Sequence, residues 1–267
     1  MKRNLGRIRA YFRRFLRGVF GDFPDDWESV EIHVSKQLRR PLREYVALVR
    51  DVDDLAFDLL QGLKGLRQPQ ELFGAHAALL VRVLQDLRVC SLSARSGYTM
   101  QAWSVAASCF EAAHTMGFLA VSPDRAASWW AHEDTEHGFC SAKAGVEGSY
   151  RYLELGAPGA ERTRLVTHEY QLYQRLCLAK HVNPVAERKR YFTRGGGKQQ
   201  LRLTPFVSKS RIKEARLGLL LAIRSAILAI WVFHRCHFRM GENDDPRIAA
   251  VATRALPLLE SWKTLDD

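Results

Sequence analysis

The stretch Leu217-Gly-Leu-Leu-Leu-Ala-Ile-Arg-Ser-Ala-Ile-Leu-Ala-Ile-Trp-Val-Phe233 is almost wholly apolar. Only Arg224 and Ser225 interrupt it, and basic residues flank both of its ends. It is slightly short for a membrane span, and an arginine at its middle would cost about 2.5–3.5 kcal/mol in a bilayer. We therefore expect a buried helix over about residues 211–240, at the centre of the fold, and no transmembrane segment.

Apolar residues recur at helical spacing through most of the rest of the chain. This pattern predicts an all-α fold, a multi-helix bundle of long antiparallel helices with one short β-hairpin insertion at about residues 190–204. Residues 25–267 are expected to form a single helical-bundle domain, preceded by a basic amphipathic helix over residues 1–20. The other predicted helices cover about residues 25–38, 41–63, 70–92, 98–119, 122–140, 158–183 and 246–262.

Composition supports a folded chain that favours anionic partners. With 267 residues, 47% of them hydrophobic, the chain can bury a sizeable core. The net charge of +11 favours RNA, another polyanion or an anionic membrane surface. The five cysteines include no CxxC pair, and the basic N-terminus lacks the apolar run of a signal peptide, so we expect reduced thiols in a cytoplasmic protein.

Two acid-free basic segments are candidates for binding a polyanion. Residues 2–20 combine an apolar stripe with basic residues, which suits either docking on the domain or a peripheral contact with a membrane or nucleic acid. Residues 188–213 contain the predicted hairpin, whose tip is Gly195–Gly197. The nucleic-acid-binding candidates on this second segment are Arg188, Lys189, Arg190, Arg194, Lys198 and Arg202.

Three polar residues are predicted to lie among apolar neighbours. Glu111 and His114 are three residues apart on the small-residue-rich helix over 98–119, and Arg224 interrupts the central apolar helix. A buried carboxylate needs a partner, which His114 or an arginine can supply. Arg224 needs an acidic partner in turn, and Glu111 is a candidate for it.

Clusters of metal-ligand residue types occur, but their spacing is poor for a single ion. His132 and His137 are five residues apart, about 140° around a helix, whereas the zinc-protease helix needs histidines four apart. The acidic residues Asp51, Asp53, Asp54 and Asp58 are expected to form a solvated helix face. We predict no metal and no cofactor from these patterns.

The segment from Pro158 to Pro184 has a clear start, an amphipathic middle and a stop at Asn183-Pro184. It carries Arg175 and His181 near its end. A histidine at a helix C-terminus is favoured by the helix dipole without any catalytic role. Both a capping role and a catalytic role for His181 therefore remain open.

The segment from about residue 72 to 233 resembles the HEPN-like group of bacterial all-helical proteins. The similar features are a Ser-Gly-Tyr turn before a helix with an inward Glu111, a helix that ends in His181 before Asn-Pro, and a basic hairpin leading through Thr204-Pro205 into an apolar helix. Many HEPN proteins are ribonucleases with an Arg, four to six residues and then a His.

The pair Arg175 and His181, with five residues between them, fits that spacing. The resemblance implies a metal-independent endoribonuclease of a toxin or defence type, in which a homodimer brings two such motifs together over RNA. Histidine can move a proton near neutral pH, and arginine can stabilise the charge on phosphorus oxygens. Arg162 with His168 and Arg125 with His132 fit the same spacing. The alternative is a non-catalytic helical protein that binds an anionic partner or membrane surface.

Overall fold

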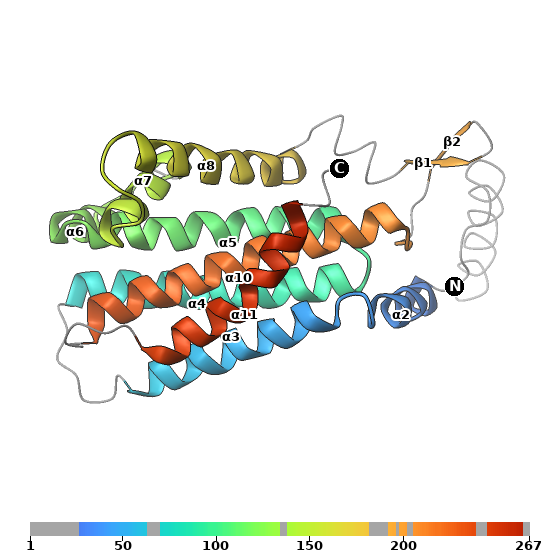
Figure 1. The fold of residues 1–267 in the computed structure, drawn as a ribbon, viewed down its shortest axis with the longest axis horizontal. Helices are drawn as coiled ribbons and strands as arrows, with labels where there is room; N and C mark the ends of the chain where they lie inside the picture. Colours follow the sequence, from blue (N-terminus) through green and yellow to red (C-terminus); the bar gives the residue numbers. More distant parts are fainter. Residues whose placement is uncertain are drawn as a thin grey trace, which may run out of the picture.

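A computed structural model describes residues 27–62, 70–133, 138–181, 192–195, 198–201, 205–238 and 245–263 (Figure 1). The predicted all-α bundle is confirmed. The helices are α2 (Trp27–Leu38), α3 (Arg43–Gly62), α4 (Gln70–Arg95), α5 (Thr99–Ala120), α6 (Pro123–Trp130), α7 (Ala142–Tyr152), α8 (Ala160–Lys180), α10 (Lys209–His237) and α11 (Pro246–Lys263). The predicted helix over residues 1–20 lies outside the described residues.

Two short strands, β1 (Phe192–Gly195) and β2 (Lys198–Leu201), pair antiparallel. Phe192 lies opposite Leu201, and Gly195 lies opposite Lys198. Both strands fall within the range 190–204 for which the sequence predicts a hairpin. Within the described part of the chain, the rest of the regular structure is helical.

Helix α10 forms the centre of the bundle, as its apolar sequence predicts. It packs against α3, α4, α5 and α11 (Figure 1). By length and composition it could cross a membrane, but 83% of its most apolar 18-residue stretch is buried inside the protein. Within the described ranges it is the one helix with these properties.

Small residues on α5 allow its neighbours to approach closely. Ala102, Ala106 and Ala113 are fully buried there. A Cβ atom on Gly117 would lie 2.2 Å from Oγ and 2.6 Å from Cα of Ser149 on α7, which is far closer than side chains tolerate. This contact fixes α7 against α5, and α7 is a helix that the sequence pattern did not predict.

The turn between α4 and α5 lies slightly later than expected. The predicted helix end at residue 92 is three residues too early, because α4 continues to Arg95. Gly97 then adopts a left-handed backbone with φ of 85°, which glycine permits without strain. The Tyr98 N–H donates to the Ser93 carbonyl at 2.8 Å and closes the helix end.

The predicted helix over 122–140 is wrong in its second half. Helix α6 ends at Trp130, and the described residues from Ala131 to Ser141 are not helical. A new helix, α7, begins after Ser141, whose hydroxyl accepts a hydrogen bond from the Ala144 N–H at 3.1 Å. The serine cap stabilises a new helix start here better than it would a helix interior.

The acidic face of α3 is paired rather than simply solvated. Asp51 contacts Arg254 of α11 at 2.7 Å, and Asp58 contacts Arg247 at 3.4 Å. On the other side, Asp53 lies 3.6 Å from Arg88 of α4. The acidic cluster therefore helps to hold α3 between α4 and α11, although each such exposed pair contributes less than about 1 kcal/mol.

Candidate functional site

The end of α8 opens onto a cleft of about 590 Å³ between α4, α5 and the segment before α7. The α8 side chains that face the core recur at spacings of three and four, as a half-buried helix requires. The helix ends at Lys180, and His181 leaves it with an extended backbone while its N–H donates to the Cys177 carbonyl. The polar residues that line this α8 cleft include Glu111, Thr115, Cys140, Lys180 and His181.

A charged pair spans the α8 cleft. The Lys180 ammonium donates to both carboxylate oxygens of Glu111, at 2.7 and 2.6 Å. The Tyr173 hydroxyl also donates to Glu111. Burial, a contact with Cys177 and the neighbouring carboxylate raise the pKa of Tyr173 above its ordinary value, so this phenol stays protonated and acts as a donor.

Arg175 and His181 both lie on the protein surface, and His181 lines the α8 cleft. Two side chains six residues apart on a helix point in directions about 120° apart. The spacing of Arg175 and His181 alone therefore does not place them on one face. Neither side chain points into the core. The exposed positions leave both groups accessible to a large ligand.

A second polar network is buried between α5, α7, α8 and α10, and Glu169 is at its centre. Glu169 is 3% exposed and pairs with the Arg224 guanidinium. The Tyr150 hydroxyl donates to it at 3.3 Å. His114 Nε2 lies 3.7 Å from the carboxylate, too far for a direct hydrogen bond, and His114 Nδ1 contacts the Ser149 hydroxyl at 3.0 Å.

Opposing effects set the protonation states in this buried network. Burial raises the pKa of Glu169, but Arg224 and the other polar neighbours outweigh it and hold the pKa below its ordinary value. Burial lowers the pKa of His114, which the Glu169 carboxylate opposes only in part. Glu169 is therefore ionised and His114 neutral near pH 7. The predicted burial of Arg224 is only partly right, because its side chain is 34% exposed. The network stabilises this charge on an otherwise apolar helix.

These contacts correct two predicted partners. The expected pair between Arg224 and Glu111 is wrong, because Arg224 contacts Glu169 and Glu111 contacts Lys180. His114 is buried as predicted, but Glu111 does not lie against it as a partner and is instead half-buried at the α8 cleft. Glu169 was missed, although its spacing of three from both Val166 and Leu172 places it on the buried face of α8.

A second cleft, of about 490 Å³, lies where α10 begins and α2 turns into α3. We call it the cationic cleft. Its wall is held by Arg216, which donates from Nε and Nη2 to the Pro41 carbonyl at 3.2 and 3.1 Å. None of the described residues that line it is acidic, and its lining residues are Arg40, Pro41, Lys209, Ile212, Lys213 and Arg216.

The predicted nucleic-acid-binding residues are only partly described. Arg194 lies on β1 opposite Gln199, and Lys198 lies on β2 opposite Gly195. The other four, Arg188, Lys189, Arg190 and Arg202, lie outside the described residues. The sequence did not single out the cationic cleft, because Arg40 is distant in sequence from the three basic residues of α10 that share it.

The cysteines do not form a reactive site. All five are free, as predicted, and Cys90 and Cys109 are fully buried. Burial raises the pKa of Cys90 to about 12 and the pKa of Cys140 above its ordinary value. Since the thiolate is the reactive form, the Cys140 thiol in the α8 cleft is a poor nucleophile near pH 7.

Comparison of the chain with protein families, with curated proteins and with solved structures finds no match.

Proposed function

We propose that this protein binds RNA and that the cationic cleft holds the phosphate backbone. The observation that carries the proposal is the convergence of Arg40, Lys209, Lys213 and Arg216 on one concavity whose described lining includes no acid. Phosphate contacts from lysine and arginine supply most of the affinity in sequence-independent binding of nucleic acids.

Three basic residues of the cationic cleft share one face of α10. Lys209, Lys213 and Arg216 follow at spacings of four and three, which places them on one face of α10. Like charges at such spacing repel, and cations are disfavoured at a helix N-terminus, where the helix dipole is positive. The first turn of α10 contains no acidic residue to offset them. A bound phosphate would relieve both effects.

Several acidic residues elsewhere in the described structure are paired with arginines. On α3, Asp51 contacts Arg254 and Asp53 contacts Arg88. Near the cleft, the Glu214 carboxylate contacts Arg211 at 3.4 Å. The described lining of the cationic cleft itself contains four basic residues and no acid, which favours an anionic ligand.

RNA fits this site better than a membrane surface does. The cleft is concave, and the bond from Arg216 to the Pro41 carbonyl holds its wall in place. Such a cleft can admit a single strand of phosphodiesters, whereas a bilayer presents a broad surface that does not enter a cleft. The strands β1 and β2 are tethered close by, because the eight residues from Leu201 to Lys209 span at most about 28 Å. The predicted nucleic-acid-binding residues Arg194 and Lys198 belong to those strands.

The test is binding of a fluorescent single-stranded RNA, followed by anisotropy at fixed salt. The double charge reversal Lys209→Glu with Lys213→Glu should weaken binding at least about 10-fold, since two phosphate contacts become repulsive. The matched control reverses two exposed basic residues of α7, Lys143→Glu with Arg151→Glu, and should change binding much less. Equal weakening by the two double variants would contradict the proposal, as would tighter binding to anionic vesicles than to RNA.

A second candidate function is metal-independent cleavage of RNA, in keeping with the HEPN-like resemblance. The observation that favours it is the exposed position of Arg175 together with that of His181 at the α8 cleft. In this proposal His181 moves the proton of the 2′-hydroxyl and Arg175 stabilises charge on the phosphate. The HEPN ribonucleases that this chain resembles bring together one motif from each of two subunits. The active species is therefore proposed to be a homodimer.

Cleavage is tested separately from binding. Wild-type protein should cleave a labelled RNA without added metal, and Arg175→Ala and His181→Ala should each abolish cleavage while RNA binding persists. The control His168→Ala alters an exposed histidine within α8 and should leave cleavage unchanged. Loss of cleavage in this variant alone would assign the activity to the pair Arg162 and His168 instead. If RNA binds but is not cleaved, or if the His181 variant cleaves as fast as wild type, the protein is a binding protein without this activity.

A further inference from the structure

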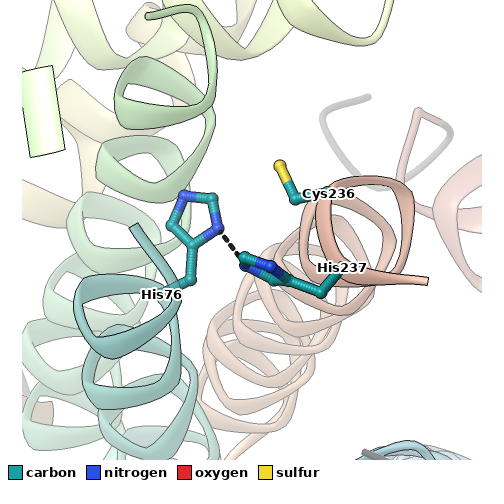
Figure 2. A group of neighbouring side chains, drawn as sticks. All are labelled: His76, Cys236 and His237. Carbon is teal, nitrogen blue, oxygen red and sulfur yellow. Dashed lines mark hydrogen bonds between the residues drawn. The ribbon is translucent and has the colours of Figure 1, made fainter. Parts of the chain in front are cut away.

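Three metal-ligating side chains converge at the junction of α4 and the last turn of α10 (Figure 2). His76 extends from α4, and Cys236 and His237 are neighbours on α10. The ligand atoms of the three lie within 4.8 Å of one another, the one such group found in the described ranges. His76 and His237 are buried, and Cys236 is half-buried.

Hydrogen bonding fixes the lone pair that His76 presents to this group. His76 Nε2 lies 3.0 Å from the Met116 carbonyl, and since a carbonyl only accepts, this nitrogen carries the proton. The neutral ring must then present an unprotonated Nδ1. That atom faces His237 Nε2 at 3.0 Å (Figure 2).

These separations suit a tetrahedral ion. With Zn–N bonds of about 2.0–2.1 Å, two histidine ligands of zinc are separated by about 3.3 Å, close to the 3.0 Å between His76 Nδ1 and His237 Nε2. With a Zn–S bond of about 2.3 Å, sulfur and nitrogen are separated by about 3.6 Å. Cys236 Sγ lies within 4.8 Å of the two histidine nitrogens, so it is at most about 1.2 Å farther away than such a zinc site requires. A rotation of the half-buried Cys236 side chain can close this gap.

We propose that His76, Cys236 and His237 form a zinc site in which His76 Nδ1, His237 Nε2 and Cys236 Sγ are the ligands. Three protein ligands leave a fourth position for water or another donor, as in open zinc sites. The ion takes the place of the proton that His237 Nε2 shares with His76 Nδ1, and the His237 ring stays neutral by carrying its proton on Nδ1 instead. It ties the end of α10 to α4, at a position unrelated to the cationic cleft.

Supporting groups already surround two of the ligands. Metal-bound histidines characteristically donate their remote N–H to a carbonyl or carboxylate, and the bond from His76 Nε2–H to Met116 has this form. Cys236 Sγ lies 2.9 Å from the Tyr152 hydroxyl. When the thiol loses its proton to become a ligand, that hydroxyl can donate to the thiolate.

Without a metal ion, burying these histidine rings costs free energy. His237 packs between the rings of Phe73 and Phe233, with centroid separations of 5.3 and 4.9 Å. Burying imidazoles in such surroundings is unfavourable without strong partners. Burial and the neighbouring ring lower the pKa of His76 to about 3, and burial lowers that of His237 to about 4. Both rings are therefore neutral near pH 7, the form that binds metals, whereas burial raises the pKa of the Cys236 thiol to about 11, so the ion must displace the thiol proton.

The test uses full-length protein stripped of metal with a chelator and titrated with Zn²⁺ against a chromophoric competitor. Co²⁺ is the spectroscopic probe, because a thiolate ligand produces a near-ultraviolet charge-transfer band and tetrahedral geometry produces intense visible bands. We expect one ion per chain and a thiolate band. Cys236→Ser should abolish the band and weaken Zn²⁺ binding at least about 100-fold.

The control Cys177→Ser removes a half-buried thiol on α8 and should bind both ions as wild type does. His237→Gln provides a second test with the thiol intact, and circular dichroism verifies that each variant is folded. The titration of the wild-type protein needs no variant and is decisive by itself. Absence of a stoichiometric ion with a thiolate band, or an unchanged band in Cys236→Ser, would show that the histidines form only a hydrogen-bonded core pair.

Discussion

Replacing Arg224 by methionine should destabilise the protein by about 3 kcal/mol. The change removes the cation next to Glu169, whose side chain is 5% exposed. Among the described residues, the Tyr150 hydroxyl is then the remaining hydrogen-bond donor to that carboxylate. Breaking a buried ion pair costs about 3–5 kcal/mol. We take the lower end because the Arg224 side chain is 34% exposed and water can partly replace it.

The measurement is thermal unfolding followed by circular dichroism. A loss of about 3 kcal/mol corresponds to a fall in Tm of roughly 6–12 °C for a chain of this size. The cost should also depend on pH. In the variant, burial without Arg224 raises the pKa of Glu169, so lowering the pH protonates the carboxylate and reduces the difference from wild type.

A double-mutant cycle isolates the pair. Glu169→Gln combined with Arg224→Met removes both charges, and the double variant should be more stable than Arg224→Met alone by about 2 kcal/mol. The control Arg88→Met disrupts the exposed pair with Asp53 and should cost less than about 0.5 kcal/mol. If Arg224→Met unfolds at the same temperature as Arg88→Met, or if Glu169→Gln gives no recovery, the ion pair does not stabilise the bundle as argued.

Three further changes test the packing and the polar groups. Gly117→Ala should cost about 2–3 kcal/mol in urea unfolding, because the new Cβ meets both Oγ and Cα of Ser149. The variant His114→Gln should lose less stability than the wild type as the pH falls. The folded pKa of His114 lies below its ordinary value, so its contribution is present above about pH 6.5 and falls by about 1.4 kcal/mol per pH unit below that. Lys180→Met should change Tm little, because its pair with Glu111 is partly exposed, with a cost below about 1 kcal/mol.

Each of these has a matched comparison. Gly62→Ala places a Cβ at an ordinary 3.4 Å from the Phe238 ring and should be nearly neutral, so equal losses at the two glycines would contradict close packing of α5 on α7. For the pH dependence, His33→Gln removes an exposed histidine of α2. A pH profile changed equally by both histidine variants would show that burial of His114 does not set its pKa.

The helices that could be predicted are those whose apolar residues alone determine burial. Helices α3 and α10 follow directly from spacing, because a long apolar face has no alternative to the core. Helix α7 could not be predicted in this way, because it contains Gly145 and Gly148, and glycine disfavours helices in general. Both glycines are required here because α5 approaches α7 closely. Contacts between distant segments decide such cases, and local propensity does not report them.

The site residues divide in the same way. Sequence spacing identified His114 and Arg224 as polar groups in apolar surroundings. Their common partner Glu169 lies in a polar run, Thr167-His168-Glu169, where only its spacing of three from Val166 and Leu172 indicates burial. His76 and His237 are 161 residues apart. No spacing rule links them, and only the packing of α4 against α10 brings the rings together.

RNA binding through the cationic cleft is tested most directly by its dependence on salt. The logarithm of the association constant for single-stranded RNA should fall linearly with the logarithm of salt concentration, and Lys209→Glu with Lys213→Glu should reduce the magnitude of the slope by about 1.4, or about 0.7 per lost phosphate contact. The α7 control, Lys143→Glu with Arg151→Glu, should keep the wild-type slope. A slope unchanged by the cleft variant, or reduced equally by the control, would contradict the assignment of the cationic cleft as the phosphate-binding site.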